Sequence, residues 1–144
     1  MFVYSCGNCR HIEFDSAPDS CPVCKVGKSE YSQNDKIFEE SAEKSKEGAV
    51  KHIPTIQVSK ECGMIPENDC IDLLIRVGET LHPMLPEHYI EFIDCYLDRK
   101  YVGRTHLTPA MNPSVIFHLQ NASGQVQIVE SCNLHGVWMT EVAI

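Results

Sequence analysis

The sequence predicts an all-β protein in which an antiparallel β-sandwich follows a small metal-knuckle domain. After Val50, short apolar alternations recur, separated by turn segments such as DRKYVG, TPAMNP and NASG. Before that point, four cysteines form two Cys-x-x-Cys pairs in a stretch that is poor in aliphatic side chains. Short strands with frequent turns are typical of a sandwich, and paired cysteines are typical of a metal site that replaces a hydrophobic core.

The chain has 144 residues, enough for one sound core and a small second unit. We therefore expect a four-cysteine metal-binding domain at residues 1–31, a linker at residues 32–48 and the sandwich at residues 49–144. The middle segment, SQNDKIFEESAEKSKEG, is rich in Glu, Lys and Ser and has no sustained apolar stripe. It is expected to form at most a frayed helical turn.

The formal net charge is −8, from 20 acidic and 12 basic side chains. This balance argues against nucleic acid or an anionic membrane as a partner. The amino terminus lacks the basic region and apolar core of a signal peptide, and no apolar run is long enough to span a bilayer. We expect a cytoplasmic protein, in which eight cysteines serve as metal ligands and buried thiols rather than as a disulfide framework.

Strand periodicity is clearest where Leu73, Ile75 and Val77 alternate with Asp72 and Arg76. Stretches such as HYIEFIDCYL, QVQIV and VWMTEVAI have the same texture. Six to eight short strands are expected.

The first metal site is predicted from Cys6, Cys9, Cys21 and Cys24. Each pair can wrap a tight turn, and two such turns give a tetrahedral tetrathiolate that suits iron or zinc. The stretch resembles the rubredoxin-like domain of rubrerythrins, which implies one iron that carries electrons. Zinc ribbons share most of the pattern, so both metals stay open. His11 is expected to be a solvated turn residue rather than a ligand.

A second site is predicted from three segments of the larger domain: AVKHIP, LHPMLPEHYIEFI and SCNLHGVW. Pro54 and Pro83 restrict the backbone beside His52 and His82, and Gly136 lets the chain turn after His135. Such placement suits ligands on loops at one end of a rigid sandwich.

These segments closely resemble superoxide reductases of the desulfoferrodoxin and neelaredoxin family, in the motifs Lys51–Pro54, His82–Ile90 and Cys132–Trp138. The resemblance implies an immunoglobulin-like β-sandwich and one iron held by four histidines and an axial cysteine. It also implies one-electron reduction of superoxide to hydrogen peroxide, a rubredoxin-type electron donor and a homodimer or homotetramer. Lys51 matches the catalytic lysine beside the open coordination position. The implied iron ligands are His52, His82, His88, Cys132 and His135.

The sequence departs from the family pattern at Val50, where many members have a glutamate that caps the ferric iron. We expect added azide or cyanide to bind the ferric protein more readily than in a glutamate-bearing relative. The alternative function is a non-catalytic iron- or zinc-binding electron-transfer protein. Cys95 is expected to be a buried hydrophobe, and Cys62 and Cys70 match no ligand position.

Overall fold

The computed structural model describes residues 1–45, 48–61 and 63–144. The chain begins with a small three-stranded antiparallel sheet in the order β2-β1-β3. A short 3-10 turn, η1, leads into the last of these strands. The elements are β1 (Val3–Cys6), β2 (Ile12–Phe14), η1 (Lys28–Glu30) and β3 (Tyr31–Gln33).

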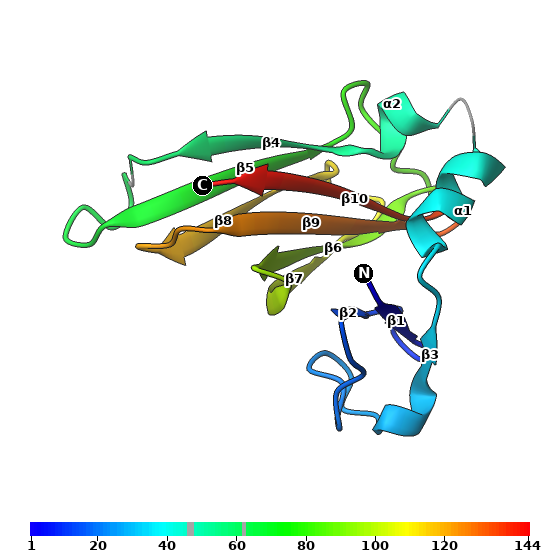
Figure 1. The fold of residues 1–144 in the computed structure, drawn as a ribbon. Coiled ribbons are helices and arrows are strands. Elements are labelled where there is room, and N and C mark those ends of the chain that lie inside the picture. Colours follow the sequence, from blue (N-terminus) through cyan, green and yellow to red (C-terminus); the bar gives the residue numbers. More distant parts are fainter. Residues whose placement is uncertain (46–47, 62) are drawn as a thin grey trace.

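The rest of the chain forms a β-sandwich, drawn in green to red in Figure 1. One sheet has the order β4-β5-β8 and the other has the order β10-β9-β6-β7, with all neighbours antiparallel. The strands are β4 (Pro54–Ser59), β5 (Cys70–Val77), β6 (Ile90–Leu97), β7 (Lys100–His106), β8 (Ser114–Gln120), β9 (Gln125–Cys132) and β10 (Gly136–Ala143). The expected antiparallel sandwich is confirmed, and its seven strands among the described residues fall within the expected six to eight.

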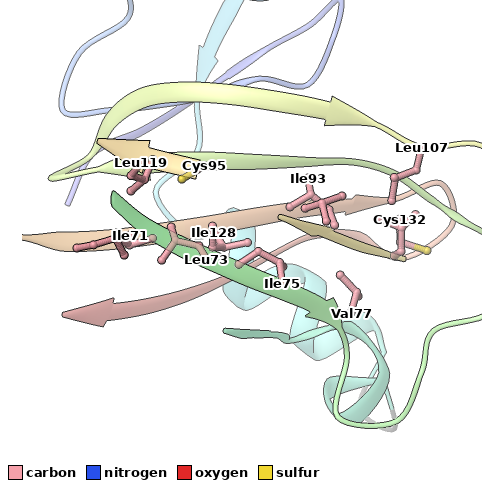
Figure 2. Packing of buried hydrophobic residues seen from close by; sticks show 13 residues of the cluster. Ile71, Leu73, Ile75, Val77, Ile93, Cys95, Leu107, Leu119, Ile128 and Cys132 are labelled. Carbon is pink, nitrogen blue, oxygen red and sulfur yellow. The ribbon is translucent and has the colours of Figure 1, made fainter. Parts of the chain in front are cut away.

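The main core lies between the two sheets, as Figure 2 shows. Leu73, Ile75 and Val77 alternate along β5 as predicted and are at most 1% exposed. They meet Ile93 of β6 and Ile128 of β9 in one cluster. Each such side chain stabilises the fold by about 1.5–3 kcal/mol on burial, so the sandwich has a rigid interior that can hold loops in place.

Two short helices lie before the sandwich. Helix α1 (Ile37–Lys44) falls in the segment expected as a linker, and it packs against β10. Helix α2 (Ala49–His52) is a single turn that leads into β4. Figure 1 places both helices at the same end of the sandwich. No helix among the described residues is long and apolar enough to cross a membrane.

The small amino-terminal sheet packs against the outer face of the four-stranded sheet. Val3, Ile12 and Phe14 form a second apolar cluster with strand residues of the sandwich, including Tyr96 and Val129. Side chains alternate across a strand, so Val129 faces this cluster while its neighbour along β9 faces the main core. Hydrophobic contact therefore holds the two parts of the chain together.

His11 corrects one expectation, because it is completely buried at this contact rather than solvated. Its Nε2 lies 3.0 Å from a carboxylate oxygen of Glu13. Its ring stacks on the ring of Tyr96, with centroids 5.9 Å apart. The Tyr96 hydroxyl lies 3.3 Å from His11 Nδ1. A polar ring survives burial where hydrogen-bond partners surround it, and here one of those partners comes from a strand more than eighty residues away.

Candidate metal centres

Five side chains converge at the end of the sandwich that carries the helices. Their ligand atoms all lie within 4.8 Å of one another. One comes from the last residue of α2, two from the loop between β5 and β6, and two from the end of β9 and the turn into β10. The residues are His52, His82, His88, Cys132 and His135. The structure thus brings together all five residues that the resemblance implied.

Hydrogen bonds to the backbone fix which ring nitrogens face inward. His52 Nδ1 donates to the Gly48 carbonyl and His82 Nδ1 donates to the Pro83 carbonyl, each at 2.7 Å. The Nε2 atoms of these two rings then carry lone pairs, and they face each other at 3.2 Å. His135 Nδ1 lies 3.2 Å from His52 Nε2. Two lone pairs at this distance repel unless a cation lies between them, so the donor set fits a metal ion.

His88 supports the same conclusion, because its Nε2 is buried and has no hydrogen-bond partner among the described residues. A buried polar nitrogen without a partner is costly. Within this cluster, a metal ion would satisfy it.

The electrostatics favour neutral imidazoles. Burial lowers the pKa of His82 to about 4. Burial, together with the charges of the neighbouring histidines, also lowers the pKa of His52. Neutral imidazole is the form that binds metal. Burial raises the pKa of Cys132, and a bound cation is what turns such a thiol into the thiolate ligand.

The indole of Trp138 contacts two of the ligands. Its ring stacks on the ring of His52, with centroids 4.8 Å apart and an interplanar angle of 18°. Its Nε1–H donates to the His135 carbonyl at 3.1 Å. Trp138 belongs to the motif that carried the resemblance, but its role in orienting the ligands is visible only in the structure.

Asn133 joins the two loops that hold His88 and Cys132. Its side-chain oxygen accepts from the Tyr89 amide at 2.9 Å, and its side-chain nitrogen donates to the Glu87 carbonyl at 3.0 Å. The sequence alone assigned no role to this residue, although it lies inside the same motif.

Helix α1 holds the turn that follows His135. The Val137 amide donates to the Ser41 hydroxyl at 3.2 Å, and that hydroxyl donates to the Ile37 carbonyl at 3.0 Å. Gly136 has φ +80°, as expected for a freed turn, and a Cβ there would lie 2.5 Å from the Ser41 oxygen. Glycine is therefore required by conformation and by space.

Lys51 is exposed on α2, directly before His52. Burial is the main reason why the pKa of His88 is lowered, and the charges of His135 and Lys51 add to the effect. Val50 is 49% exposed and offers no ligand atom. An apolar rim flanks the ligands; it comprises Val50, Ile53, Leu81, Leu85 and Leu134, each at least 43% exposed.

The second metal site lies beside the amino-terminal sheet, with Cys6 at the end of β1 and the other three cysteines outside the strands. The sulfurs of Cys6, Cys9, Cys21 and Cys24 all lie within 4.8 Å of one another. Cys6 and Cys24 are 3.7 Å apart and Cys9 and Cys21 are 3.6 Å apart. Sulfurs bound at about 2.3 Å in a tetrahedron are separated by about 3.8 Å. The four sulfurs thus fit one tetrahedrally bound ion, iron or zinc.

Thiolate character is already favoured at one of these cysteines. Burial opposes ionisation of Cys21, but the neighbouring backbone amides, that of Cys24 above all, outweigh it and lower the pKa of Cys21 to about 6. Among the remaining cysteines, Cys95 is fully buried in the main core, as expected. Cys70 is not a free thiol, and Cys62 lies outside the described residues.

Comparisons with known proteins support both sites. The family model for desulfoferrodoxin matches residues 41–141, and the model for the rubredoxin-like domain of rubrerythrin matches residues 4–32. A desulfoferrodoxin homolog of Archaeoglobus fulgidus is 31% identical over 141 residues, covering 97% of this chain and 96% of that protein. A superoxide reductase of Pyrococcus horikoshii is 29% identical, covering 65% of this chain and 87% of that protein. The match to desulfoferrodoxin of Syntrophotalea carbinolica is 32% identical and covers 63% of this chain, but only 62% of that relative's length.

Two solved structures share the fold. Superoxide reductase (neelaredoxin) from Ignicoccus hospitalis superposes with a TM-score of 0.59 at 25% identity, covering 70% of this chain and 85% of that one. The superoxide reductase from Treponema pallidum gives a TM-score of 0.52 at 32% identity, covering 65% and 66%. The desulfoferrodoxin family binds iron, and both the four-histidine, one-cysteine site and the four-cysteine site are present here. With a matching family model over residues 41–141, the chain belongs to the desulfoferrodoxin family and carries a rubrerythrin-type rubredoxin-like domain at its amino terminus.

Proposed function

We propose that this protein is a superoxide reductase, which reduces superoxide by one electron to hydrogen peroxide. The observation that carries the proposal is the cluster of five ligand atoms within 4.8 Å, in which two imidazole lone pairs face each other at 3.2 Å. Relatives named superoxide reductase support it. The five ligands would hold the catalytic iron, and Cys6, Cys9, Cys21 and Cys24 would hold a second iron or a zinc.

The donor set suits the reaction. Superoxide is an anion that must take up one electron and two protons. Iron bound by these five residues would supply the electron, because it can change its charge by one where zinc cannot. Four neutral imidazoles and one thiolate leave a ferrous centre with a net charge of about +1. Such a site attracts a small anion.

Lys51 would act on the substrate through its charge and its N–H donors. The whole protein carries a net charge of −8, but charges beyond roughly 8 Å are screened at physiological ionic strength. The local ammonium group therefore outweighs distant carboxylates. It would draw superoxide towards the five-ligand site and donate a hydrogen bond to the substrate oxygen as negative charge develops.

Each turnover consumes one electron, so a reductant is required. We propose a rubredoxin-type protein as the electron donor and a homodimer or homotetramer as the working form. We also propose the division of the chain into a four-cysteine domain at residues 1–31, a linker at 32–48 and the catalytic domain at 49–144.

Metal analysis and superoxide consumption test the proposal. The purified protein should contain iron at the five-ligand site and consume pulsed superoxide in step with oxidation of an added reductant, without release of dioxygen. Dioxygen release would indicate dismutation. Full metal loading without superoxide consumption would favour a non-catalytic electron-transfer protein.

Two buried cysteines, Cys132 and Cys95, supply a test variant and a matched control. Cys132→Ser should abolish both the thiolate-to-iron colour and the consumption of superoxide. Cys95→Ala removes another buried thiol, in the neighbouring strand of the same sheet, and should leave both intact. A metal-loaded Cys132→Ser protein as active as the parent would overturn the proposal.

A further inference from the structure

The small amino-terminal domain holds the start of helix α1. Strand β3, which pairs with β1, leads directly towards this helix. The Asn34 amide donates to the Val3 carbonyl at 2.8 Å, and the Val3 amide donates to the Asp35 carboxylate at 2.9 Å. Ile37 and Phe38 then pack against the apolar cluster between the small domain and the sandwich. The first turn of α1 is therefore placed by the small domain.

The rest of α1 contacts two segments of the five-ligand site. Ser41 is 5% exposed, and its hydroxyl accepts from the Val137 amide at the start of β10. The carbonyl of Ser45, directly after the helix, accepts from the Gly48 amide at 2.8 Å. The Gly48 carbonyl in turn accepts from His52. Through these bonds one short helix reaches the backbone beside two of the histidine ligands.

A cavity of about 300 Å³ lies where the small domain, α1 and the ligand turn meet. Its walls include Ser5 and Cys6 of the small domain, Ser41 and Lys44 of α1, and Cys132 and Gly136 of the ligand turn. A cavity contributes no packing contacts across its width. The position of α1 therefore depends on the contacts at its two ends.

Neither the helix nor the small domain is stable by itself. Helix α1 has eight residues, and isolated helices of this length are marginal in water. The small domain is poor in aliphatic side chains, so metal binding supplies much of its folding free energy. Loss of that metal would loosen the sheet that places the first turn of α1.

From this geometry we propose that a metal ion in the four-cysteine site strengthens iron binding at the five-ligand site, with Ser41 as the positioning residue that couples the two. The inference rests on iron binding at the five-ligand site, as in the proposed function, but not on the reduction of superoxide. It involves no electron transfer, so zinc at the four-cysteine site serves as well as iron. Coupling of this kind is reciprocal and typically changes affinity by about 5–150-fold.

A second contact also joins the two ligand sets, but it is weaker. Arg10 Nη1 lies 3.3 Å from the hydroxyl of Ser131 in β9. The side chains of Arg10 and its charge partner Glu91 are 52% and 31% exposed, and exposed ion pairs contribute little. Loss of the Ser41 hydroxyl instead leaves the buried Val137 amide without its acceptor, which is costly. The contact at Ser41 therefore carries the coupling.

Iron affinity at the five-ligand site, measured by chelator competition, tests the coupling. The double variant Cys21→Ser/Cys24→Ser removes two sulfurs from the four-cysteine site, on the knuckle opposite Cys6. It should bind iron at the five-ligand site at least about fivefold more weakly than the parent protein with zinc at the four-cysteine site. Equal affinities would overturn the coupling. The parent with iron at the four-cysteine site should match the zinc form, and a difference between the two would contradict a purely structural effect.

Further variants locate the route. Ser41→Ala should weaken iron binding in the parent and cause little further loss in Cys21→Ser/Cys24→Ser, because both changes break the same link. Alanine is the best helix former, so such a loss cannot come from a weaker helix. Glu43→Ala, at an exposed position of the same helix, is the matched control and should keep the parent affinity. Additive losses, or loss of the coupling in Arg10→Met instead, would refute the role of Ser41.

Hydrogen exchange separates positioning from general loosening. In the iron-loaded protein, Cys21→Ser/Cys24→Ser should speed exchange of the Val137 amide while the amides of β5 keep their rates. Equal acceleration in β5 would indicate general unfolding and would rule out the route through Ser41. A protein that shows the coupling and binds iron but does not consume superoxide would contradict the proposed function and support this inference.

Discussion

At the scale of single residues, Trp138 serves two metal ligands at once. Its ring stacks on His52 and its indole N–H holds the His135 carbonyl. Trp138→Phe keeps an aromatic ring but loses the N–H. Groups that orient metal ligands typically contribute about 10–100-fold to metal affinity. We therefore expect iron affinity, measured by chelator competition, to fall by about that factor. An unchanged affinity would show that stacking alone orients the ligands.

Cys95 is a residue whose reactivity can be predicted from burial. It is fully buried, and burial raises its pKa to about 12, with the charge of Asp94 adding to the effect. The thiolate is the reactive form, and the folded protein populates it only as the pH approaches that value. Iodoacetamide at about pH 8.5, near the ordinary thiol pKa, should leave Cys95 unmodified in the native holoprotein and label it after unfolding, as mapped by mass spectrometry. Rapid labelling of the native protein would contradict the burial.

At the scale of elements, the loop after β5 supports α2. The Thr80 amide donates to the Val50 carbonyl at 3.0 Å. A Cβ at Gly78 would lie 2.8 Å from the Lys51 carbonyl carbon and the Val50 carbonyl oxygen. Both contacts are with backbone, which has little room to move. This loop therefore sets the position of the helical turn that carries Lys51 and His52.

Gly78→Ala should push α2 outward. We expect a loss of about 1–3 kcal/mol in the free energy of unfolding, as for other overpacked sites, together with weaker iron binding. Gly103→Ala in β7 is the control, because a Cβ there meets no atom within 4 Å among the described residues. Denaturant unfolding and iron titration of the two variants would check this, and equal behaviour of the two would contradict it.

At the scale of the whole molecule, a buried ion pair underlies the contact between the four-cysteine domain and the sandwich. Arg104 lies 2.6 Å from Asp94, and their side chains are 3% and 0% exposed. The same guanidinium lies over the Phe92 ring and reaches the Cys9 carbonyl. It thus links the sheet to the small domain through a site that is shielded from water.

Removing Arg104 would leave the Asp94 carboxylate buried without its charge partner. Arg104→Ala should therefore lower the free energy of unfolding by about 3–5 kcal/mol. Arg99→Ala breaks the exposed ion pair that Arg99 makes with Asp15, whose side chains are 44% and 62% exposed respectively. This change should lower the free energy of unfolding by at most about 1 kcal/mol. Denaturant unfolding monitored by Trp138 fluorescence would measure both, and similar losses would refute the role of the buried pair.

Much of this architecture could be predicted from local sequence. Apolar alternation at Leu73, Ile75 and Val77 predicted a strand with one buried face, and the structure has it. Family resemblance singled out the five residues that the fold brings within 4.8 Å of one another. The small domain was predicted from its cysteine spacing. These features are local because side-chain periodicity and ligand chemistry are properties of short segments.

The contact between the two parts of the chain was not predicted. His11 was expected in solvent and is buried, and the segment around Ser41 was expected to be a linker but forms a helix that supports the turn after His135. The segment around Ser41 has few apolar residues, so neither helix propensity nor apolar periodicity predicted a stable helix there. Partners distant in sequence decide both outcomes.

The sequence by itself determined the strand pattern, the two sets of metal-binding side chains and the family. Only the tertiary structure decided that the two sites share a cavity wall and that Arg10 reaches Ser131. The physical reason is that a ligand's chemistry is carried by its own side chain. A docking surface instead arises from complementary packing between segments separated by 81 to 121 positions, and no short stretch encodes it.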